Sequence, residues 1–191
     1  MTFRQYRRTD ILILSVMACV FEGAVTLAGA KWFPEQPYSL SITLTVICLA
    51  FMRWDKFALF IPALCGVVFC AASGADFSQY IIYCVGNCAA SLSLLFFKIW
   101  GKKLREDVFK TLVYVCATFV FIQAGRWAVS LIYGAEPAII LNFITTDALS
   151  LFFAAVVILL ARNIDGLFED QKAYLIRTEK QRDEERRANP R

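Results

Sequence analysis

The sequence predicts an all-α membrane protein: a bundle of six transmembrane helices with both termini in the cytoplasm. Three observations lead to this fold class. First, 59% of the 191 residues are hydrophobic and only 19% are charged, whereas soluble domains are about 45–50% apolar. Second, long apolar segments recur along the whole chain. Third, Lys and Arg cluster in alternate intervals between these segments, which is typical of cytoplasmic loops.

Six apolar segments are candidates for membrane spans, because a spanning helix needs about 20 residues. The second and third are short, so we expect one of them to be bent, tilted or partly unwound. The domain organisation is then a transmembrane domain over residues 1–161 and a charged cytoplasmic tail over 162–191, whose second half we expect to be solvated or disordered. The six segments cover residues 11–30, 37–52, 57–73, 78–97, 110–133 and 138–161.

The basic residues orient these segments. They gather in the N-terminus, in the loops at 53–56 and 98–110 and in the tail, whereas the three remaining loops hold only Lys31. The positive-inside rule places the basic regions in the cytoplasm, and only an even number of spans puts both basic ends there. We therefore expect a multi-pass protein of a bacterial plasma membrane. Its charge points to contact with membrane lipid and not with nucleic acid.

The residue types that most catalysis and metal binding need are missing. The chain has no His, and its seven Cys lie in apolar segments without a CxxC motif, so neither a zinc site nor thiol redox chemistry is expected. No Walker loop occurs. An intramembrane aspartyl protease using Glu22 and Asp147 is the remaining catalytic alternative, but the usual flanking motifs are absent. We expect no catalytic residues, no cofactor and no metal.

Charged residues inside the predicted spans are the main candidates for a binding site, because each costs at least about 2.5–3.5 kcal/mol at the membrane centre. Glu22, Arg126 and Asp147 are such residues, and Asn87 is a fourth polar residue in the same position. Each lies about 12–14 Å from the outer end of its span, given the rise of a helix. Four spans therefore bring polar side chains to one level in the outer half of the membrane.

Helical spacing adds neighbours to this polar layer. Two interpretations are open. Arg126 pairs with Asp147 or Glu22 only to hold the bundle together, or the layer lines a ligand cavity open to the outside, which also accounts for the other polar side chains. The neighbours are Tyr83 near Asn87, Gln123 and Trp127 near Arg126, and Asn142 and Thr146 near Asp147.

Three motifs extend the argument: Pro37-Tyr38-Ser39-Leu40-Ser41-Ile42 before the short second span, the turn Arg53-Trp54-Asp55-Lys56 followed by Pro62 and Gly66, and the tail segment 165–175. With these motifs, nearly the whole chain resembles the substrate-binding S component of energy-coupling factor (ECF) vitamin transporters, in an orphan branch without an assigned vitamin. The resemblance implies a subunit that captures a small water-soluble vitamin or precursor from outside. Its partners would be a transmembrane coupling subunit and two ATPase subunits.

The resemblance also implies residue roles. Ligand contacts would be Asn87, Gln123, Arg126, Trp127, Asn142 and Asp147, with stacking from Tyr83 and Trp32. Glu22 and Thr146, from the polar layer, complete the candidate ligand-binding set.

Small residues on the first span dock the coupling subunit in that family, because they allow close approach of helices. The matching residues here are Ser15, Cys19 and Gly23, with Ala18 alongside. Residues 24 and 28 carry the family's Ala-x-x-x-Ala letters further out, so which row docks is open. The rival functions are an independent small transporter or channel, an intramembrane enzyme, and a structural or assembly protein.

Overall fold

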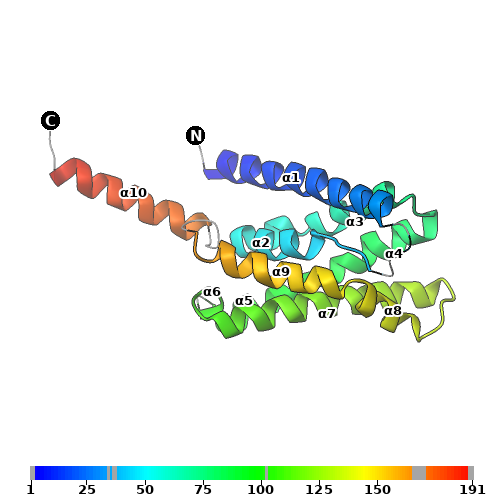
Figure 1. The fold of residues 1–191 in the computed structure, drawn as a ribbon. Coiled ribbons are helices and arrows are strands. Elements are labelled where there is room, and N and C mark those ends of the chain that lie inside the picture. Colours follow the sequence, from blue (N-terminus) through cyan, green and yellow to red (C-terminus); the bar gives the residue numbers. More distant parts are fainter. Residues whose placement is uncertain (1–2, 34, 36–37, 102, 165–170, 189–191) are drawn as a thin grey trace.

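The computed structural model describes residues 3–188, except residues 34, 36–37, 102 and 165–170. The described residues form helices and no strand (Figure 1). Two of the helices are 3₁₀ helices and are labelled η. The elements are α1 (Phe3–Trp32), α2 (Thr43–Trp54), η1 (Asp55–Ala58), α3 (Ile61–Ser73), α4 (Phe77–Asn87), η2 (Cys88–Leu94), α5 (Leu95–Trp100), α6 (Lys103–Glu106), α7 (Val108–Ile132), α8 (Ile139–Thr146), α9 (Ala148–Ala161) and α10 (Gln171–Ala188).

Three helical runs are long and apolar enough to cross a membrane: α1, α7, and Phe77–Trp100, which joins α4, η2 and α5. A fourth consists of α8 and α9 together, bent by 42° where they meet. With 12 and 13 residues, α2 and α3 are about 18–20 Å long, short of the hydrocarbon core of about 30 Å. The described residues thus include three or four helices of spanning length, while six crossings stay a prediction.

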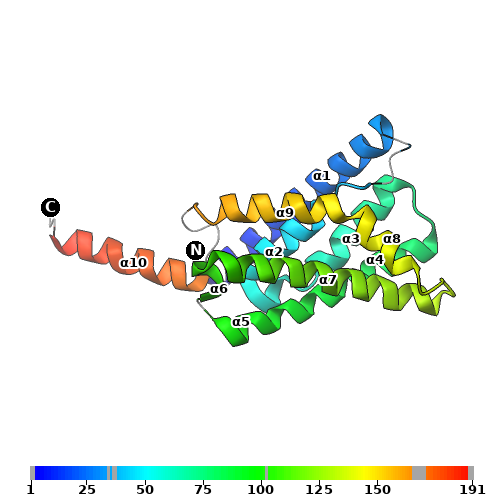
Figure 2. The ribbon, with the colours of Figure 1, turned by 60° about the horizontal axis from the view of Figure 1, so that its bottom comes forward.

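The short helix α2 is the most enclosed element of the bundle. Its buried side chains point in all directions, among them Ile47, Phe51 and Met52, as expected for a helix that is apolar all round. It packs against α1, α3, α7 and α9 (Figures 1 and 2). The predicted span 37–52 differs from this helix, because residues 38–42 enter the bundle without helical structure and α2 begins only at Thr43.

The other predicted spans correspond to helices with two internal irregularities. The predicted span 110–133 agrees closely with α7, and α1 begins well before residue 11. The span predicted at 78–97 tightens into the 3₁₀ helix η2 directly after Asn87. The span predicted at 138–161 breaks at Asp147, between α8 and α9. Both irregularities therefore lie next to residues of the predicted polar layer.

Two glycines allow α4 and α7 to cross at very short distance. A Cβ atom on Gly86 would lie 2.6 Å from the Cα atom of Arg126. One on Gly125 would lie 2.2 Å from the carbonyl oxygen of Gly86. Since any side chain at these positions would collide with main chain, the crossing needs both glycines. The close approach brings Asn87, the residue after Gly86, against Arg126.

The start of α1 and the start of α10 lie at the same end of the bundle (Figure 1), as an even number of crossings requires. The Tyr6 hydroxyl donates to Oε1 of Gln171 at 3.3 Å. At this end Arg53 of α2 holds Asp10 of α1 with two donors, Nη2 to Oδ1 at 2.9 Å and Nε to Oδ2 at 3.1 Å. The indole nitrogen of Trp54 donates to the same carboxylate. This clamp ties the first helix to the end of α2.

The tail is helical from Gln171 to Ala188, including most of the second half, which we expected to be solvated or disordered. The helix α10 projects away from the bundle (Figures 1 and 2) and is polar over residues 177–187, after the apolar residues 173–176. Its sequence is rich in Glu, Lys, Gln and Arg, which are strong helix formers even without tertiary packing. Residues 165–170, which belong to the tail motif at 165–175, lie outside the described residues.

Candidate functional site

Arg126 on α7 is the centre of a buried polar cluster, with 4% of its surface exposed. Its Nη1 atom forms an ion pair with Oδ2 of Asp147, and its Nε donates to Oδ1 of Asn87 at 2.8 Å. Nη1 also donates to Oε1 of Gln123 at 3.5 Å. The guanidinium carbon lies 4.3 Å from the centre of the Tyr83 ring, within the range of a cation–π contact. One guanidinium therefore joins α4, α7 and the break between α8 and α9.

Asp147 is also buried, and its carboxylate accepts hydrogen bonds from three residues. Its Oδ2 accepts from Nε2 of Gln123 at 3.1 Å as well as from Arg126. Its Oδ1 accepts from the Ser39 hydroxyl at 2.8 Å. A charged side chain is tolerated in an apolar interior only when it has an opposite charge and hydrogen-bond partners, as here. The cluster is thus closed on itself, with each charge satisfied by protein groups.

Ser39 also explains the break in the last membrane helix. Its main-chain amide donates to the carbonyl of Thr146 at 3.0 Å, an acceptor that an unbroken helix would use for Ser150. The Ser150 hydroxyl accepts from the Ser41 amide at 2.9 Å and donates to the Ser39 carbonyl at 3.2 Å. A second segment inserted into the helical ladder is a recognised cause of kinks. Non-helical backbone inside the bundle is possible because other protein groups form hydrogen bonds with its amide and carbonyl groups.

Glu22 on α1 has a different role from the one we expected. Its side chain is fully buried, and its Oε2 accepts from the main-chain amide of Ile42 at 2.8 Å. The hydroxyl of Ser41 accepts from the next amide, that of Thr43, at 3.1 Å. A carboxylate is favourable at the start of a helix, where amide groups have no intrahelical partner. Glu22 therefore anchors the beginning of α2 and is not the partner of Arg126.

The free space beside the cluster is very small. A cavity of about 10 Å³ lies between the start of α2 and the Arg126 side chain. That is room for about one water molecule. Any larger ligand at this point requires Arg126 and Asp147 to separate. The polar residues that line the cavity are Ser41, Thr43, Gln123, Arg126, Asp147 and Ser150.

The structure brings the central members of the predicted polar layer into contact and places other members elsewhere. Asn87, Arg126 and Asp147, from three predicted spans, are in direct hydrogen-bond contact, and Gln123 and Tyr83 join them. Glu22 reaches only the start of α2, and Thr146 contributes its carbonyl group. The layer is therefore real, but narrower than the sequence suggests.

Three predicted ligand contacts lie away from the cluster. Trp32 is 70% exposed at the end of α1. The indole nitrogen of Trp127 donates to the Pro137 carbonyl at 3.0 Å, which ties α7 to the loop before α8. Asn142 is exposed and lines a separate hollow of about 430 Å³ beside residues 135–141. Position along a helix does not determine the direction in which a side chain points around the helix axis. These three side chains therefore point away from the cluster although the sequence placed them with it.

Some cluster residues were missed by sequence reasoning. Ser39 was noted only as part of the motif at 37–42, and Ser150, Gly86 and Gly125 were not among the candidate residues. The available signal was the alternating polar series Ser39, Ser41, Thr43 and Thr45 inside a nominal membrane span. Such a series indicates backbone that must be satisfied by neighbours.

The residues predicted to dock a coupling subunit do not form one exposed row. Ser15 and Cys19 line a groove between α1 and α3. Ala18 is 1% exposed and faces the bundle interior. A Cβ atom on Gly23 would lie 3.6 Å from Val68, so this residue faces α3.

Comparison with known proteins gives no match: no family model fits the sequence, and neither a curated protein nor a solved structure is similar to the chain. Within the described part of the chain, no group of three or more His, Cys, Asp or Glu residues could hold a metal ion. The polar cluster is therefore the feature of the molecule from which a function can be inferred. The molecule that carries it is an all-helical protein with several helices of membrane-spanning length.

Proposed function

We propose that the chain is the substrate-binding subunit of an ATP-driven ECF-type importer, which captures a small water-soluble vitamin or precursor from outside the cell. The observation that carries this proposal is the cluster around Arg126. Ionisable residues within membrane helices are rare, and they commonly mark substrate or ion pathways. Here one guanidinium, one carboxylate, two carboxamides and an aromatic ring converge inside a bundle whose core is mainly apolar.

The proposed topology has six crossings and both ends in the cytoplasm, with α2 and α3 as the two short crossings. Two observations support it. The described chain starts and ends at one end of the bundle, and the basic segments 53–56 and 98–110 alternate with loops nearly free of Lys and Arg. In this topology the Arg126 cluster lies in the outer half of the membrane.

The cluster suggests the chemistry of the ligand. A ligand carboxylate or other anionic group would replace Asp147 at Arg126, and a ligand donor would take over the Asp147 carboxylate. The amides of Asn87 and Gln123 would orient a polar ring or chain, and Tyr83 would stack on it. Because the pair must open first, binding is coupled to movement. The bend at Asp147 and the 3₁₀ helix η2 after Asn87 are the places where such movement is most easily absorbed.

A structural role for the cluster is the second candidate, and one observation favours it. The adjoining cavity has room for only about one water molecule, and both charges already have partners. On this interpretation, the Arg126–Asp147 pair specifies how the helices assemble, and no small molecule binds. The two candidates therefore differ in whether a ligand competes for these side chains.

The experiment is identification of small molecules that remain bound to the purified chain, by mass spectrometry, followed by calorimetric titration with a panel of water-soluble vitamins and precursors. We expect Arg126→Gln and Asp147→Asn to weaken binding of the identified compound. The matched control is Asp10→Asn, which removes a carboxylate from the other Arg–Asp pair, far from the cluster. Unchanged affinity in both cluster variants, measured on folded protein, would contradict the site.

A second arm separates the rival transport functions. Co-purification with a coupling subunit and two ATPases supports an importer subunit. Uptake by the purified chain alone in liposomes would instead identify an independent transporter.

A further inference from the structure

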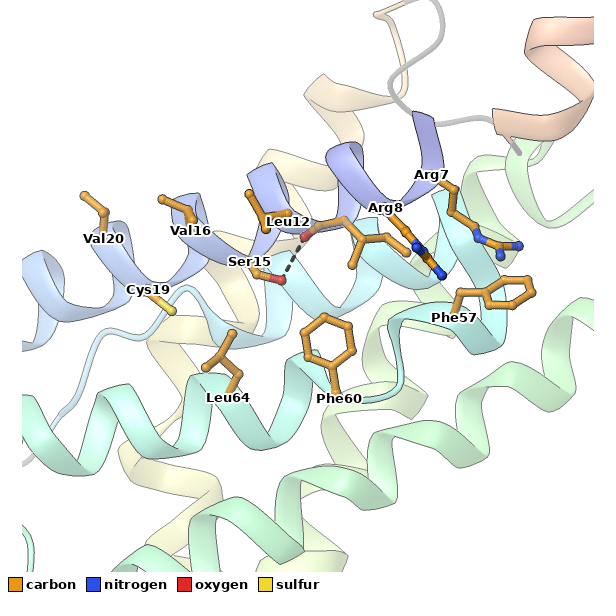
Figure 3. Close-up of a pocket in the computed structure, with 11 residues that line it drawn as sticks. Arg7, Arg8, Leu12, Ser15, Val16, Cys19, Val20, Phe57, Phe60 and Leu64 are labelled. Carbon is orange, nitrogen blue, oxygen red and sulfur yellow. Dashed lines mark hydrogen bonds between the residues drawn. The ribbon is translucent and has the colours of Figure 1, made fainter. Parts of the chain in front are cut away.

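A groove of about 650 Å³ runs along the outside of the bundle between α1 and the segment formed by η1 and α3. Its walls are mostly apolar, with Leu12, Val16 and Val20 from α1 and Phe57, Phe60 and Leu64 from the other side. Figure 3 shows Phe60 and Leu64 pointing from α3 and its start toward α1. Leu12, Val16 and Val20 are each about half exposed or more. In a membrane this groove faces lipid.

One end of the groove is cationic. Arg7 and Arg8 lie together there, at the start of α1 (Figure 3). The guanidinium carbon of Arg7 lies 3.7 Å from the centre of the Phe57 ring, which orients it at the mouth of the groove. Among the residues that the structure describes, no acidic one lines the groove, and the nearby carboxylate of Asp10 is already held by Arg53. The two positive charges are therefore not neutralised by the groove itself.

The groove has the length of one membrane leaflet. From Arg8 to Val20, α1 rises about 18 Å at 1.5 Å per residue. Half of a hydrocarbon core of about 30 Å is about 15 Å. A charged head at the arginines and one acyl chain beside Val20 would thus lie at the depths that a phospholipid occupies in a bilayer.

We propose that this groove binds one anionic phospholipid, with its headgroup phosphate at Arg7 and Arg8 and one acyl chain between α1 and α3. Arginine is well suited to the phosphate because its planar donors match phosphate oxygens. The Ser15 hydroxyl, which also lines the groove, already donates a hydrogen bond to the Ile11 carbonyl at 2.8 Å. Apart from the arginines, the surface offers apolar contact, which suits an acyl chain.

A protein helix fits this groove less well. Close helix docking needs a continuous row of small exposed residues. Here only Ser15 and Cys19 line the groove, while Ala18 is buried and Gly23 faces Val68, so the small residues of α1 do not continue along it as such a row. The two arginines at the end of the groove would also have no anionic partner in a contact between two apolar helices.

The experiment uses the full chain in lipid nanodiscs that contain phosphatidylcholine with a minor share of phosphatidylglycerol, followed by native mass spectrometry of retained lipid. We expect retained phosphatidylglycerol. The double variant Arg7→Gln/Arg8→Gln should lose about thirtyfold in affinity, the loss expected when two basic residues leave an anionic surface. Lys98→Gln/Lys103→Gln removes the same charge at exposed positions outside the groove and should retain the lipid.

A variant that fills the groove tests the acyl-chain part of the proposal. Leu64→Trp leaves both arginines in place and should also abolish retention. A photo-crosslinking residue at Val16 in native membranes should give an adduct with the mass of a phospholipid. Equal retention of phosphatidylcholine, retention by the Arg7/Arg8 double variant, or a crosslink to a polypeptide would each overturn the proposal. None of these results depends on vitamin binding.

Discussion

Arg126 of α7 forms a buried ion pair with Asp147, which lies at the break between α8 and α9. The pair brings together residues of α7 and of the α8–α9 junction, and Asn87 and Ser39 attach α4 and the segment before α2 to it. Four parts of the chain thus depend on two charged side chains. This dependence makes the cluster the point where stability and ligand binding can be measured in the same variants.

Removal of one charge should destabilise the protein strongly. We expect Asp147→Asn to lower the free energy of unfolding by about 3–5 kcal/mol, because it leaves a buried guanidinium without its counter-charge. The double variant Arg126→Met/Asp147→Leu should lose less unfolding free energy than the two single variants Arg126→Met and Asp147→Leu lose together. Unfolding in mixed detergent measures the free energy of each variant. Strictly additive losses would show that the two side chains do not interact.

The anchoring of α2 by Glu22 can be tested separately. Glu22→Leu removes the acceptor for the Ile42 amide and should cost about 1–2 kcal/mol, as the loss of a helix cap does. Glu22→Gln keeps an acceptor oxygen and should cost less. Hydrogen exchange should become faster in the first turn of α2 in the Leu variant. Unchanged exchange there would contradict the role of Glu22 at this helix start.

The crossing of α4 and α7 should tolerate no side chain. Gly86→Ala and Gly125→Ala place a Cβ against main chain at 2.6 and 2.2 Å, and we expect each to cost about 1–3 kcal/mol, as overpacking does. Gly29→Ala on α1 is the matched control, since nothing lies within 4 Å of its Cβ. It should stabilise the protein by about 0.4–1 kcal/mol. Similar thermal stability of all three variants would be inconsistent with the close crossing.

The Ser39–Asp147 hydrogen bond has a natural counterpart on the surface. Ser78 donates to Asp76 at 3.0 Å in an exposed position, whereas Ser39 donates to the buried carboxylate at 2.8 Å. Ser39→Ala should therefore cost about 1.5–3 kcal/mol, the range for a hydrogen bond to a charged group. Ser78→Ala should cost much less. Thermal unfolding of the two variants gives the comparison, and equal losses would argue against a buried role for Ser39.

The start of α7 should depend on pH. The hydrogen bond from Lys110 holds the pKa of Asp107 below its ordinary value of 3.8, with help from the Phe109 amide. A lowered pKa in the folded state means that the contribution to stability is present above the ordinary value and is lost as the pH falls through the lowered one. The melting-temperature difference between wild type and Asp107→Ala should therefore shrink on acidification below about pH 3.9. A melting-temperature difference that stays constant with pH would refute this role of Asp107.

Predictability from the sequence varied with the kind of feature. The long apolar helices and the depth of Asn87, Arg126 and Asp147 were predictable, because hydropathy and helical rise are properties of a chain in one dimension. The non-helical entry at residues 38–42 was not, since its main chain is satisfied by Thr146 and Ser150, more than a hundred positions away. The second half of the tail, which we expected to be solvated or disordered, is helical as far as Ala188, because helix propensity can act without a packed partner.

The sequence by itself determined that the chain has helices long and apolar enough to span a membrane and that these helices carry opposite charges. It could not determine which carboxylate pairs with Arg126, because Glu22 and Asp147 lie at similar depths. Only the tertiary structure decided this. The glycine crossing of α4 with α7 and the insertion of residues 38–42 beside Thr146 direct Asp147 toward the guanidinium, while the start of α2 takes up Glu22. Both outcomes depend on contacts between distant segments, which no local pattern contains.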